Sequence, residues 1–414
     1  MPAHVYRARR RSARIRRFAA ATGAIVVVAA VAWFSTALLV SVPAPRLVPA
    51  IAATRTVPGR ALALRPPLPA QEAVALEGVG TIATAGGDTP TPIASLTKVM
   101  SALVVLRDHP LGIGESGPEI TVTPAEVRTY TAERAQQDSV VAVRAGEHLS
   151  ELQALEAALV PSGDNIIQLL ATWDAGSTPA FVARMNALAR TLGLSHTHYA
   201  GPSGVDPASV STATDQLRLA EVAMANPVFR SIVAMAQVTL PVAGLQYNVN
   251  GDLGRDGIDG IKTGWVPQGG GCLLFSAATR VADRRVAVVG AVLDDQGKSP
   301  IPDALSQARR VVVAADKALT TLRIPSGTVV ASLRAPYAPR PVEVLTASPV
   351  SMLTWKGATV RFRLHADRSS SGSLPAGSEV GTLEIGVGGR ERQVLLRTSS
   401  ALPGPSLGWR LEHP

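Results

Sequence analysis

Cysteine, lysine and aromatic residues are scarce in this sequence of 414 residues, in which aromatic side chains make up only 4%. The single cysteine, Cys272, cannot form an intramolecular disulfide, which excludes a disulfide framework. It lies in the apolar run GCLLFSAA, where no basic neighbour in sequence would lower the pKa of its thiol. We therefore expect Cys272 to be a buried strand residue and not a nucleophile.

Lysine is replaced by arginine almost everywhere that the chain carries a positive charge. Of 40 basic residues only five are lysine: Lys98, Lys262, Lys298, Lys317 and Lys356. Arginine cannot lose its proton in a protein, whereas lysine can when it is buried or lies next to another cation. The lysines therefore mark candidate sites where a neutral amine is needed.

Charge is absent from Phe18 to Pro45, and a helix needs about 20 apolar residues to cross the hydrocarbon core of a membrane. We expect residues 18–42 to form a transmembrane anchor. Residues 1–17 carry seven arginines and no acidic residue, which places this basic tail in the cytoplasm and the remainder of the chain outside the cell membrane. Cleavage of a signal peptide near the small residues of SVPAP, followed by secretion, is the alternative.

The formal net charge of +9 comes mostly from the same basic tail. A nucleic-acid-binding arm is the competing interpretation of that tail. No nucleic-acid-binding motif or interleaved aromatic cluster accompanies it. We therefore expect a membrane partner and no nucleic acid.

The rest of the chain divides into three parts by pattern. Residues 43–71 combine repeated proline with spaced arginine and show no periodicity, which predicts an extended linker. Residues 72–324 pass from a strand signal through helical periods to further strands and a last helix, which indicates an α/β (α+β) domain with a mixed sheet and a helical lobe. Residues 325–414 alternate apolar and polar residues between turns, which predicts a small all-β domain.

The segment PIASLTKVM places Ser95 and Lys98 three residues apart at the start of a predicted helix. Residues at this spacing share a helix face, so the two side chains can touch. Serine is a weak nucleophile until a base takes its proton, and a lysine with a lowered pKa can be that base. A helix-capping serine followed by a surface lysine is the alternative.

Two further motifs follow in the chain: Ser-Gly-Asp at residues 162–164 and Lys-Thr-Gly at residues 262–264. Ser-x-x-Lys, Ser-x-Asx and Lys-Thr-Gly in this order are the signature of penicillin-binding proteins and serine β-lactamases. From about residue 74 to residue 322 the chain resembles a serine D-alanyl-D-alanine carboxypeptidase, a low-molecular-mass penicillin-binding protein. The resemblance implies the penicillin-binding-protein and serine β-lactamase fold for this region.

The resemblance also implies the chemistry. Ser95 would attack the peptide bond between two D-alanines and form an acyl-enzyme, with Lys98 as the base. Ser162 would relay a proton to the leaving amine. The implied substrate is a peptidoglycan stem peptide ending in D-Ala-D-Ala, and β-lactam antibiotics would be covalent inhibitors. The reaction needs no metal and no organic cofactor.

The resemblance implies that the third motif, residues 262–264, and the adjacent Trp265 bind the substrate. Lys262 and Thr263 would hold the terminal carboxylate of the substrate. Gly264 would let the strand approach the substrate closely, and the backbone N–H groups of Ser95 and Trp265 would form the oxyanion hole. Lys262 would also supply the like charge that lowers the pKa of the base.

Asp164 departs from the family pattern, in which the second motif usually ends in asparagine. A carboxylate cannot donate a hydrogen bond to a substrate carbonyl, and beside Lys98 it would favour the protonated amine. We expect that Asp164 either pairs with Lys262 or reduces or redirects the activity. A non-catalytic cell-wall-binding scaffold that retains the fold is therefore the second hypothesis.

A β-lactamase is a third hypothesis, and the sequence disfavours it. Class A enzymes need a glutamate between the second and third motifs to activate water, and the only glutamate there is Glu221, inside an apparent helix. His196 and His198 resemble a two-ligand metal fragment, but no His-Glu-x-x-His motif or acidic partner accompanies them. We expect a polar turn there and no metal site.

Overall fold

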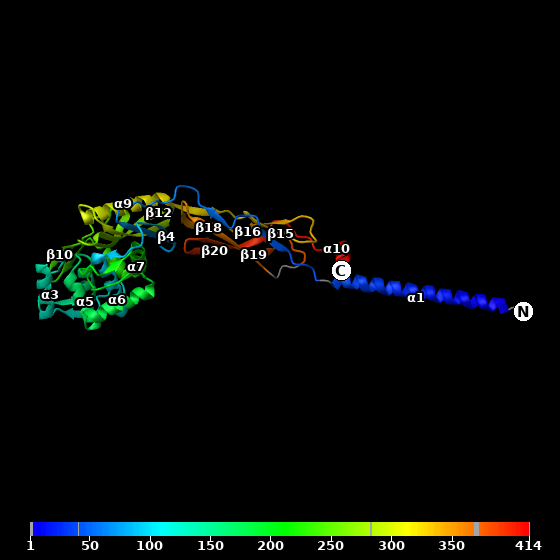
Figure 1. Cartoon of the computed structure of the whole chain (residues 1–414), viewed down its shortest axis with the longest axis horizontal. Helices are drawn as coiled ribbons and strands as arrows, with labels where there is room; N and C mark the ends of the chain where they lie inside the picture. Colours follow the sequence, from blue (N-terminus) through cyan, green and yellow to red (C-terminus); the bar gives the residue numbers. More distant parts are fainter. Residues whose placement is uncertain (1–2, 40, 282–283, 368–371, 414) are drawn as a thin grey trace.

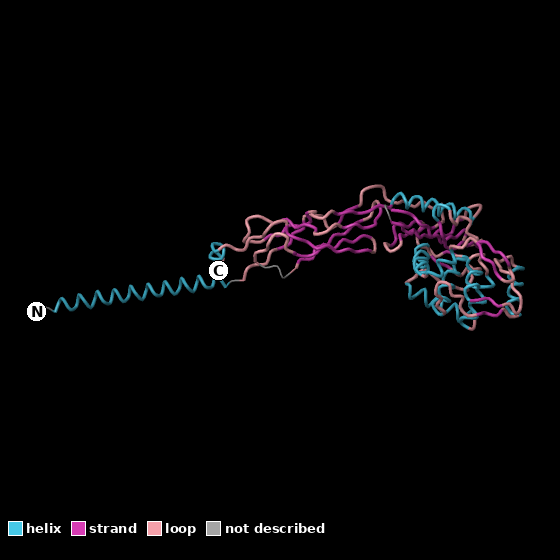
Figure 2. The backbone as a smooth tube through the Cα atoms, turned by 180° about the vertical axis from the view of Figure 1, so that it is seen from behind, coloured by secondary structure: helices cyan, strands magenta, loops and turns pink. Residues whose placement is uncertain are grey.

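The computed structural model describes residues 3–39, 41–281, 284–367 and 372–413. The molecule is elongated, and Figure 1 shows three parts in succession: helix α1 (Ala3–Leu39), a β-rich part and a part in which helices cover a sheet. Figure 2 shows the same order from behind, with most helices gathered at the end far from the N-terminus. The β-rich part lies in the middle of the molecule although most of its strands come last in the sequence.

A five-stranded antiparallel sheet forms the frame of the helix-covered part. Its strand order is β11-β12-β13-β3-β4. The strands are β3 (Gln71–Leu76), β4 (Gly80–Ala85), β11 (Ile258–Val266), β12 (Gly270–Val281) and β13 (Arg284–Asp295). Alternate residues of these strands point to opposite faces, and the two faces belong to different apolar clusters. Helix α9 (Pro300–Ala318) packs on one face and α7 (Ala213–Ala225) on the other.

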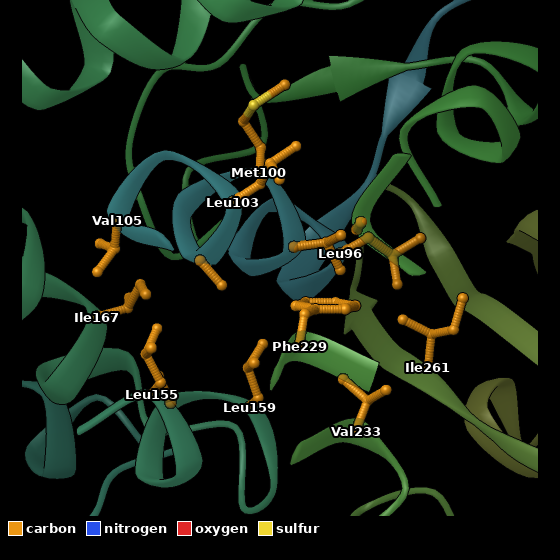
Figure 3. Packing of buried hydrophobic residues seen from close by; sticks show 14 of the residues in the cluster. Leu96, Met100, Leu103, Val105, Leu155, Leu159, Ile167, Phe229, Val233 and Ile261 are labelled. Atoms are coloured by element: carbon orange, nitrogen blue, oxygen red, sulfur yellow. The ribbon is translucent and has the colours of Figure 1, made fainter. Parts of the chain in front are cut away.

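The helical lobe is inserted between β4 and β11. Its central helix, α2 (Thr97–Asp108), is buried from residue 97 to residue 106, including the polar side chains of Thr97, Lys98 and Ser101. Figure 3 shows Met100, Leu103 and Val105 of α2 among apolar side chains from other helices of the lobe. Helices α4 (Glu151–Leu159), α5 (Asp164–Ala175), α6 (Thr178–Leu192) and α7 contact α2, while α3 (Pro124–Ala135) packs on α5 and α8 (Pro227–Val233) packs on α4 and α7.

Short elements complete the lobe and connect it to the sheet. They are β5 (Thr91–Pro92), η1 (Ala94–Leu96), β6 (Glu119–Thr121), β7 (His148–Ser150), β8 (Val210–Ser211), β9 (Gln237–Leu240), β10 (Gly244–Tyr247) and η2 (Arg255–Gly257). The mixed α/β fold with a helical lobe that the sequence predicts is confirmed. Cys272 is buried on β12, and burial raises the pKa of its thiol to about 12, as expected for a structural residue.

The β-rich part contains a seven-stranded antiparallel sheet with the order β1-β15-β16-β20-β19-β18-β2. Five of its strands come from the predicted all-β region: β15 (Val329–Arg334), β16 (Val342–Thr346), β18 (Thr359–Ala366), β19 (Glu379–Val387) and β20 (Arg390–Thr398). A separate two-stranded ladder joins β14 (Leu319–Ile324) to β17 (Val350–Trp355). The chain ends in a short helix, α10 (Leu407–Glu412).

Both edge strands of the seven-stranded sheet come from the segment predicted to be an extended linker. Strand β1 (Arg46–Pro49) pairs with β15, and β2 (Thr54–Thr56) pairs with β18. Within residues 43–71, which the sequence predicts to be an extended linker, these two short segments are thus edge strands of a sheet. Strands of three and four residues are too short to show alternation, and the proline and arginine that indicated a linker are also typical of sheet edges.

The two sheet-containing parts meet through their hairpin turns. The N–H of Gly389, in the β19–β20 turn, donates to the carbonyl of Val79 in the β3–β4 turn at 2.7 Å. Arg390 donates from Nε to the carbonyl of Gly78. Backbone and side chain thus both connect the β-rich part to the sheet of the helix-covered part.

Glu151, the first residue of α4, has a buried carboxyl group without a hydrogen-bond partner among the described residues. The residue is fully buried, and among the described residues neither carboxylate oxygen has a hydrogen-bond partner. Burial, with a smaller contribution from Asp174, raises the pKa of Glu151 from 4.5 to about 7. The folded chain then binds this proton more tightly than the unfolded chain, so the free energy of unfolding falls as the pH rises from 4.5 through 7.

We expect Glu151→Gln to remove this part of the pH dependence. The shift corresponds to at most about 3 kcal/mol, so the wild type should lose up to that amount of stability relative to the variant between acidic and alkaline pH. Urea unfolding of the detergent-solubilised protein on both sides of the titration measures the difference. Glu343→Gln, which changes an exposed carboxyl on β16, is the control. Parallel pH profiles for wild type and Glu151→Gln would contradict the prediction.

Candidate active site

Ser95 and Lys98 lie on one continuous helical stretch formed by η1 and α2. The amine Nζ of Lys98 lies 2.8 Å from the Oγ of Ser95. Lys98 has 0% of its surface exposed, whereas Ser95 is partly exposed. Ser95 is inside η1 and does not cap either helix, because the N-cap positions are Ile93 and Leu96. The alternative of a capping serine followed by a surface lysine is therefore wrong.

Four oxygen atoms surround Nζ of Lys98. They are Asp164 Oδ1 at 2.6 Å, Ser95 Oγ at 2.8 Å, the carbonyl of Ser203 at 3.2 Å and Ser162 Oγ at 3.4 Å. The ionised carboxylate and the carbonyl can only accept hydrogen bonds. These two acceptors hold the Lys98 amine where it also lies within hydrogen-bond distance of the Ser95 hydroxyl.

Two residues that border this cluster have backbone angles that are rare outside glycine. Ala94, directly before Ser95, has φ +49°, and Ser162 has φ +69°. Such conformations cost on the order of 1–3 kcal/mol each and persist only where the surroundings impose them. In the turn between α4 and α5 this backbone sets the buried Oγ of Ser162 within reach of Lys98. The strain is thus located where the two hydroxyls are positioned.

Strand β11 brings the third motif to the same place. Lys262 is buried, and its Nζ donates to the carbonyl of Thr263 at 3.0 Å. Burial first, and then the charge of Lys98, hold the pKa of Lys262 well below its usual range, while Asp164 opposes this shift. A second buried lysine therefore lies in electrostatic contact with Lys98.

Gly264 makes the close approach between β11 and η1 possible. A Cβ atom at this position would lie 2.9 Å from the backbone nitrogen of Ser95 and 3.0 Å from the Cβ of Ala94. The next residue, Trp265, is 51% exposed. The strand therefore runs beside the backbone of Ser95 and carries an exposed aromatic side chain near its end.

Asp164 forms its ion pair with Lys98 and not with Lys262. Its Oδ1 lies 2.6 Å from Nζ of Lys98, and both side chains are buried. The expected pairing with Lys262 is therefore wrong. Asn165 does not take the place of an asparagine at 164, because its amide is turned away and bonds the backbone of Val141 through both Oδ1 and Nδ2.

Three residues near the cluster were not predicted from the sequence. Ser203 contributes only a backbone carbonyl, which no side-chain pattern signals. Glu133 lies near the end of α3, and Asp138 lies just after that helix. Burial, and to a smaller extent the charge of Asp164, raises the pKa of both carboxyl groups. For Glu133 the pKa is raised to about 7. These side chains come from a segment with no recognisable motif.

The weaker candidates lie apart from this cluster. Glu221 lines a separate cavity of about 570 Å³ together with Arg230 and Asp259. His196 lies in a turn, as expected, whereas His198 forms an isolated antiparallel bridge with Val210. Within the described part of the chain, no group of three or more His, Cys, Asp or Glu side chains is placed to hold a metal ion.

Comparison with known proteins gives one consistent family. Residues 64–297 match the model of the D-alanyl-D-alanine carboxypeptidase peptidase family. A D-alanyl-D-alanine carboxypeptidase of Streptomyces sp. strain K15 is 31% identical over 253 residues, which cover 57% of this chain and 82% of the relative. A D-alanyl-D-alanine endopeptidase of Escherichia coli K12 is 32% identical over 279 residues, covering 65% and 83%.

Solved structures agree with these matches. The crystal structure of the Streptomyces K15 DD-transpeptidase has a TM-score of 0.52 at 28% identity and covers 62% of this chain and 98% of its own. Penicillin-binding protein 5 from Haemophilus influenzae has a TM-score of 0.58 at 20% identity and covers 82% of this chain and 99% of its own. At that identity the second likeness shows the fold alone.

We expect Gly264→Ala to slow the reaction of Ser95 at least tenfold. The added methyl group collides with the Ser95 backbone and must push β11 away from η1. The rate at which a fluorophosphonate probe modifies the protein measures the effect, with Ser95→Ala as the blank. Gly251→Ala is the matched control, because nothing lies within 4 Å of a Cβ there. Equal slowing by both glycine variants would contradict the prediction.

Proposed function

Because the chain belongs to the D-alanyl-D-alanine carboxypeptidase family of serine-type hydrolases, we propose that it removes the terminal D-alanine from peptidoglycan stem peptides through an acyl-enzyme on Ser95. The observation that carries this proposal is the buried amine of Lys98, 2.8 Å from the Ser95 hydroxyl and held there by two fixed acceptors. A buried lysine in contact with a partly exposed serine is the arrangement that activates a hydroxyl nucleophile.

In the proposed acylation, Lys98 takes the proton of Ser95 as Oγ attacks the carbonyl carbon between the two D-alanines. The C–N bond then breaks. The leaving amine of D-alanine receives a proton from Lys98 through the hydroxyl of Ser162, which lies 3.4 Å from Nζ. Water hydrolyses the ester in a second step, which restores the Ser95 hydroxyl and releases the shortened peptide.

Substrate binding is proposed to use β11. Lys262 in its charged form, with Thr263, attracts the carboxylate of the terminal D-alanine. The backbone N–H groups of Ser95 and Trp265 stabilise the oxyanion, which is supported by the close approach of the neighbouring Gly264 to the Ser95 nitrogen. Penicillins that mimic the D-alanyl-D-alanine end would then acylate Ser95.

Asp164 is compatible with this reaction but provides only the acceptor, and not the donor, of the two hydrogen-bonding groups of an asparagine side chain. Its Oδ1 accepts a hydrogen bond from Lys98, as an amide oxygen would. It has no N–H to offer a substrate carbonyl. We therefore propose an active enzyme with weaker transition-state binding, in preference to the non-catalytic scaffold. The position of Glu221 beside a separate cavity gives no support to a β-lactamase.

We further propose that α1 is a single-pass anchor with its N-terminus in the cytoplasm. Residues 15–39 are the one helix, within the described residues, that is long and apolar enough to cross a membrane, and the segment is almost wholly exposed. Residues 72–324 would then be the catalytic domain and 325–414 a β domain. Secretion after cleavage near residues 41–45 is the alternative.

We expect a fluorescent penicillin to label the full-length protein covalently and to leave Ser95→Ala unlabelled. Labelling is read in a denaturing gel, where only a covalent adduct survives. Ser101→Ala, which removes a buried hydroxyl one turn along α2, is the control and should still be labelled. Equal labelling of the Ser95→Ala variant would remove the basis of the proposed mechanism.

We expect Asp164→Asn to release D-alanine from a D-alanyl-D-alanine pentapeptide about tenfold faster than the wild type. One added hydrogen bond from the amide to the substrate carbonyl is worth about 1 kcal/mol or somewhat more. Asp164→Ala should be slower than the wild type, because Lys98 loses a buried acceptor. The measurement is kcat/KM from an enzymatic D-alanine assay. A slower Asp164→Asn variant would show that the carboxylate itself is needed.

A further inference from the structure

The end of α1 is fixed to the β-rich part and does not leave it on a free linker. Only residues 40–45 separate the end of α1 at Leu39 from the start of β1 at Arg46. Arg410 of α10 donates from Nη1 to the carbonyl of Leu38 at 3.1 Å. Ala37 is buried although the rest of the apolar span is exposed, and Val42 packs against the core of the β-rich part.

Four arginines belong to elements of this end of the β-rich part, where Figure 1 shows the end of α1 beside α10. Arg46 at the start of β1 is the register partner of Arg334 at the end of β15. Arg340 lies in the turn that follows β15, and Arg410 lies in α10. We call these four residues the arginine collar.

The turn after β15 and helix α10 are held side by side by aromatic contacts. The rings of Tyr337 and Trp409 meet edge to face, with centroids 5.8 Å apart. Trp409 also stacks on His413 at 4.6 Å. Two collar arginines that are 70 residues apart in sequence, Arg340 and Arg410, are thereby carried by elements in direct contact.

The collar has a net positive charge that the protein does not neutralise. Like charges directly opposite each other in an antiparallel pair are destabilising, as in Arg46 and Arg334. Among the described residues no carboxylate lies within ion-pair distance of any collar arginine. The geometry calls for an external anion.

In a membrane crossed by α1, the phosphate groups of the lipids would lie at the level of the arginine collar. Phosphate groups of the lipid surround the helix where it leaves the hydrocarbon, and guanidinium groups bind phosphate oxygens in a two-pronged geometry. We propose that the arginine collar binds the phosphate groups of anionic phospholipids and fixes the β-rich part against the membrane surface. This inference rests on the proposed insertion of α1.

The test compares the full-length protein in nanodiscs of phosphatidylcholine alone and of phosphatidylcholine mixed with phosphatidylglycerol. Hydrogen–deuterium exchange of residues 334–341 and 405–413 reports how firmly the collar is held. Anionic lipid should slow exchange there, each arginine contributing about fivefold at low salt. Residues 258–266, in the candidate active site, should exchange equally in both lipids.

Charge variants separate the collar from a general effect of positive charge. The collar variant is R46Q/R334Q/R340Q/R410Q, and it should abolish the difference between the two lipids. The matched control is R55Q/R323Q/R361Q/R392Q, which removes four exposed arginines around β2, β14, β18 and β20 and should keep the difference.

The direction in which the melting temperature changes provides a second, independent test of the proposal. Arg334→Gln removes a like-charge pair, so it should leave the melting temperature unchanged or raise it in neutral nanodiscs. In anionic nanodiscs the same change removes a lipid contact, so it should lower the melting temperature. The same direction of change in both lipids would overturn the proposal.

The outcomes distinguish the anchor from the collar. A protein that neither kind of nanodisc retains overturns the membrane-spanning role of α1 and the collar proposal together. A retained protein with equal exchange in both lipids overturns the collar proposal alone. Soluble polyphosphate could slow the exchange of the collar segments in neutral nanodiscs as much as anionic lipid does. That result would show that the collar binds a soluble polyanion, and it would likewise overturn binding to lipid.

Discussion

The buried ammonium or amine of Lys98 is the constraint on which the site depends. Transferring a charged lysine side chain from water to the interior of the helical lobe costs free energy unless hydrogen-bond partners compensate the lost hydration. Asp164 and the carbonyl of Ser203 supply that compensation from two separate segments of the lobe. The same contacts that make the buried lysine tolerable also fix its direction toward Ser95. Stability and chemistry therefore depend on one set of hydrogen bonds.

The fold supplies these partners by packing α2 inside the lobe and pressing η1 against β11. Gly204 and Gly264 are two glycines whose backbone lies directly against the backbone of η1. A Cβ at Gly204 would lie 1.8 Å from the carbonyl of Ala94, and a Cβ at Gly264 would lie 2.9 Å from the nitrogen of Ser95. Ala94, the strained residue before Ser95, is thus held in place from both sides. These contacts explain how an alanine is held in a left-handed conformation.

The sequence predicted the residues with local signatures and missed those without. Ser95 and Lys98 share a helix face, and the glycine of the third motif indicated a close approach, so both were visible in short patterns. The carbonyl of Ser203 and the strands β1 and β2 were not visible, because each depends on a partner distant in sequence. The partner of Asp164 was also mistaken, since two lysines were available and only the tertiary packing decides between them.

The N-terminal and C-terminal regions of the chain are joined to each other by strand pairing and by a contact between two helices. Strand β1 pairs with β15, and α10 contacts α1, so the N-terminal helix and the C-terminal region form one unit. That unit touches the helix-covered part through the hairpin turns at Val79 and Gly389. The distance between the proposed anchor and Ser95 is therefore set by a sheet whose longest strands have nine residues, about 30 Å, and not by a flexible spacer.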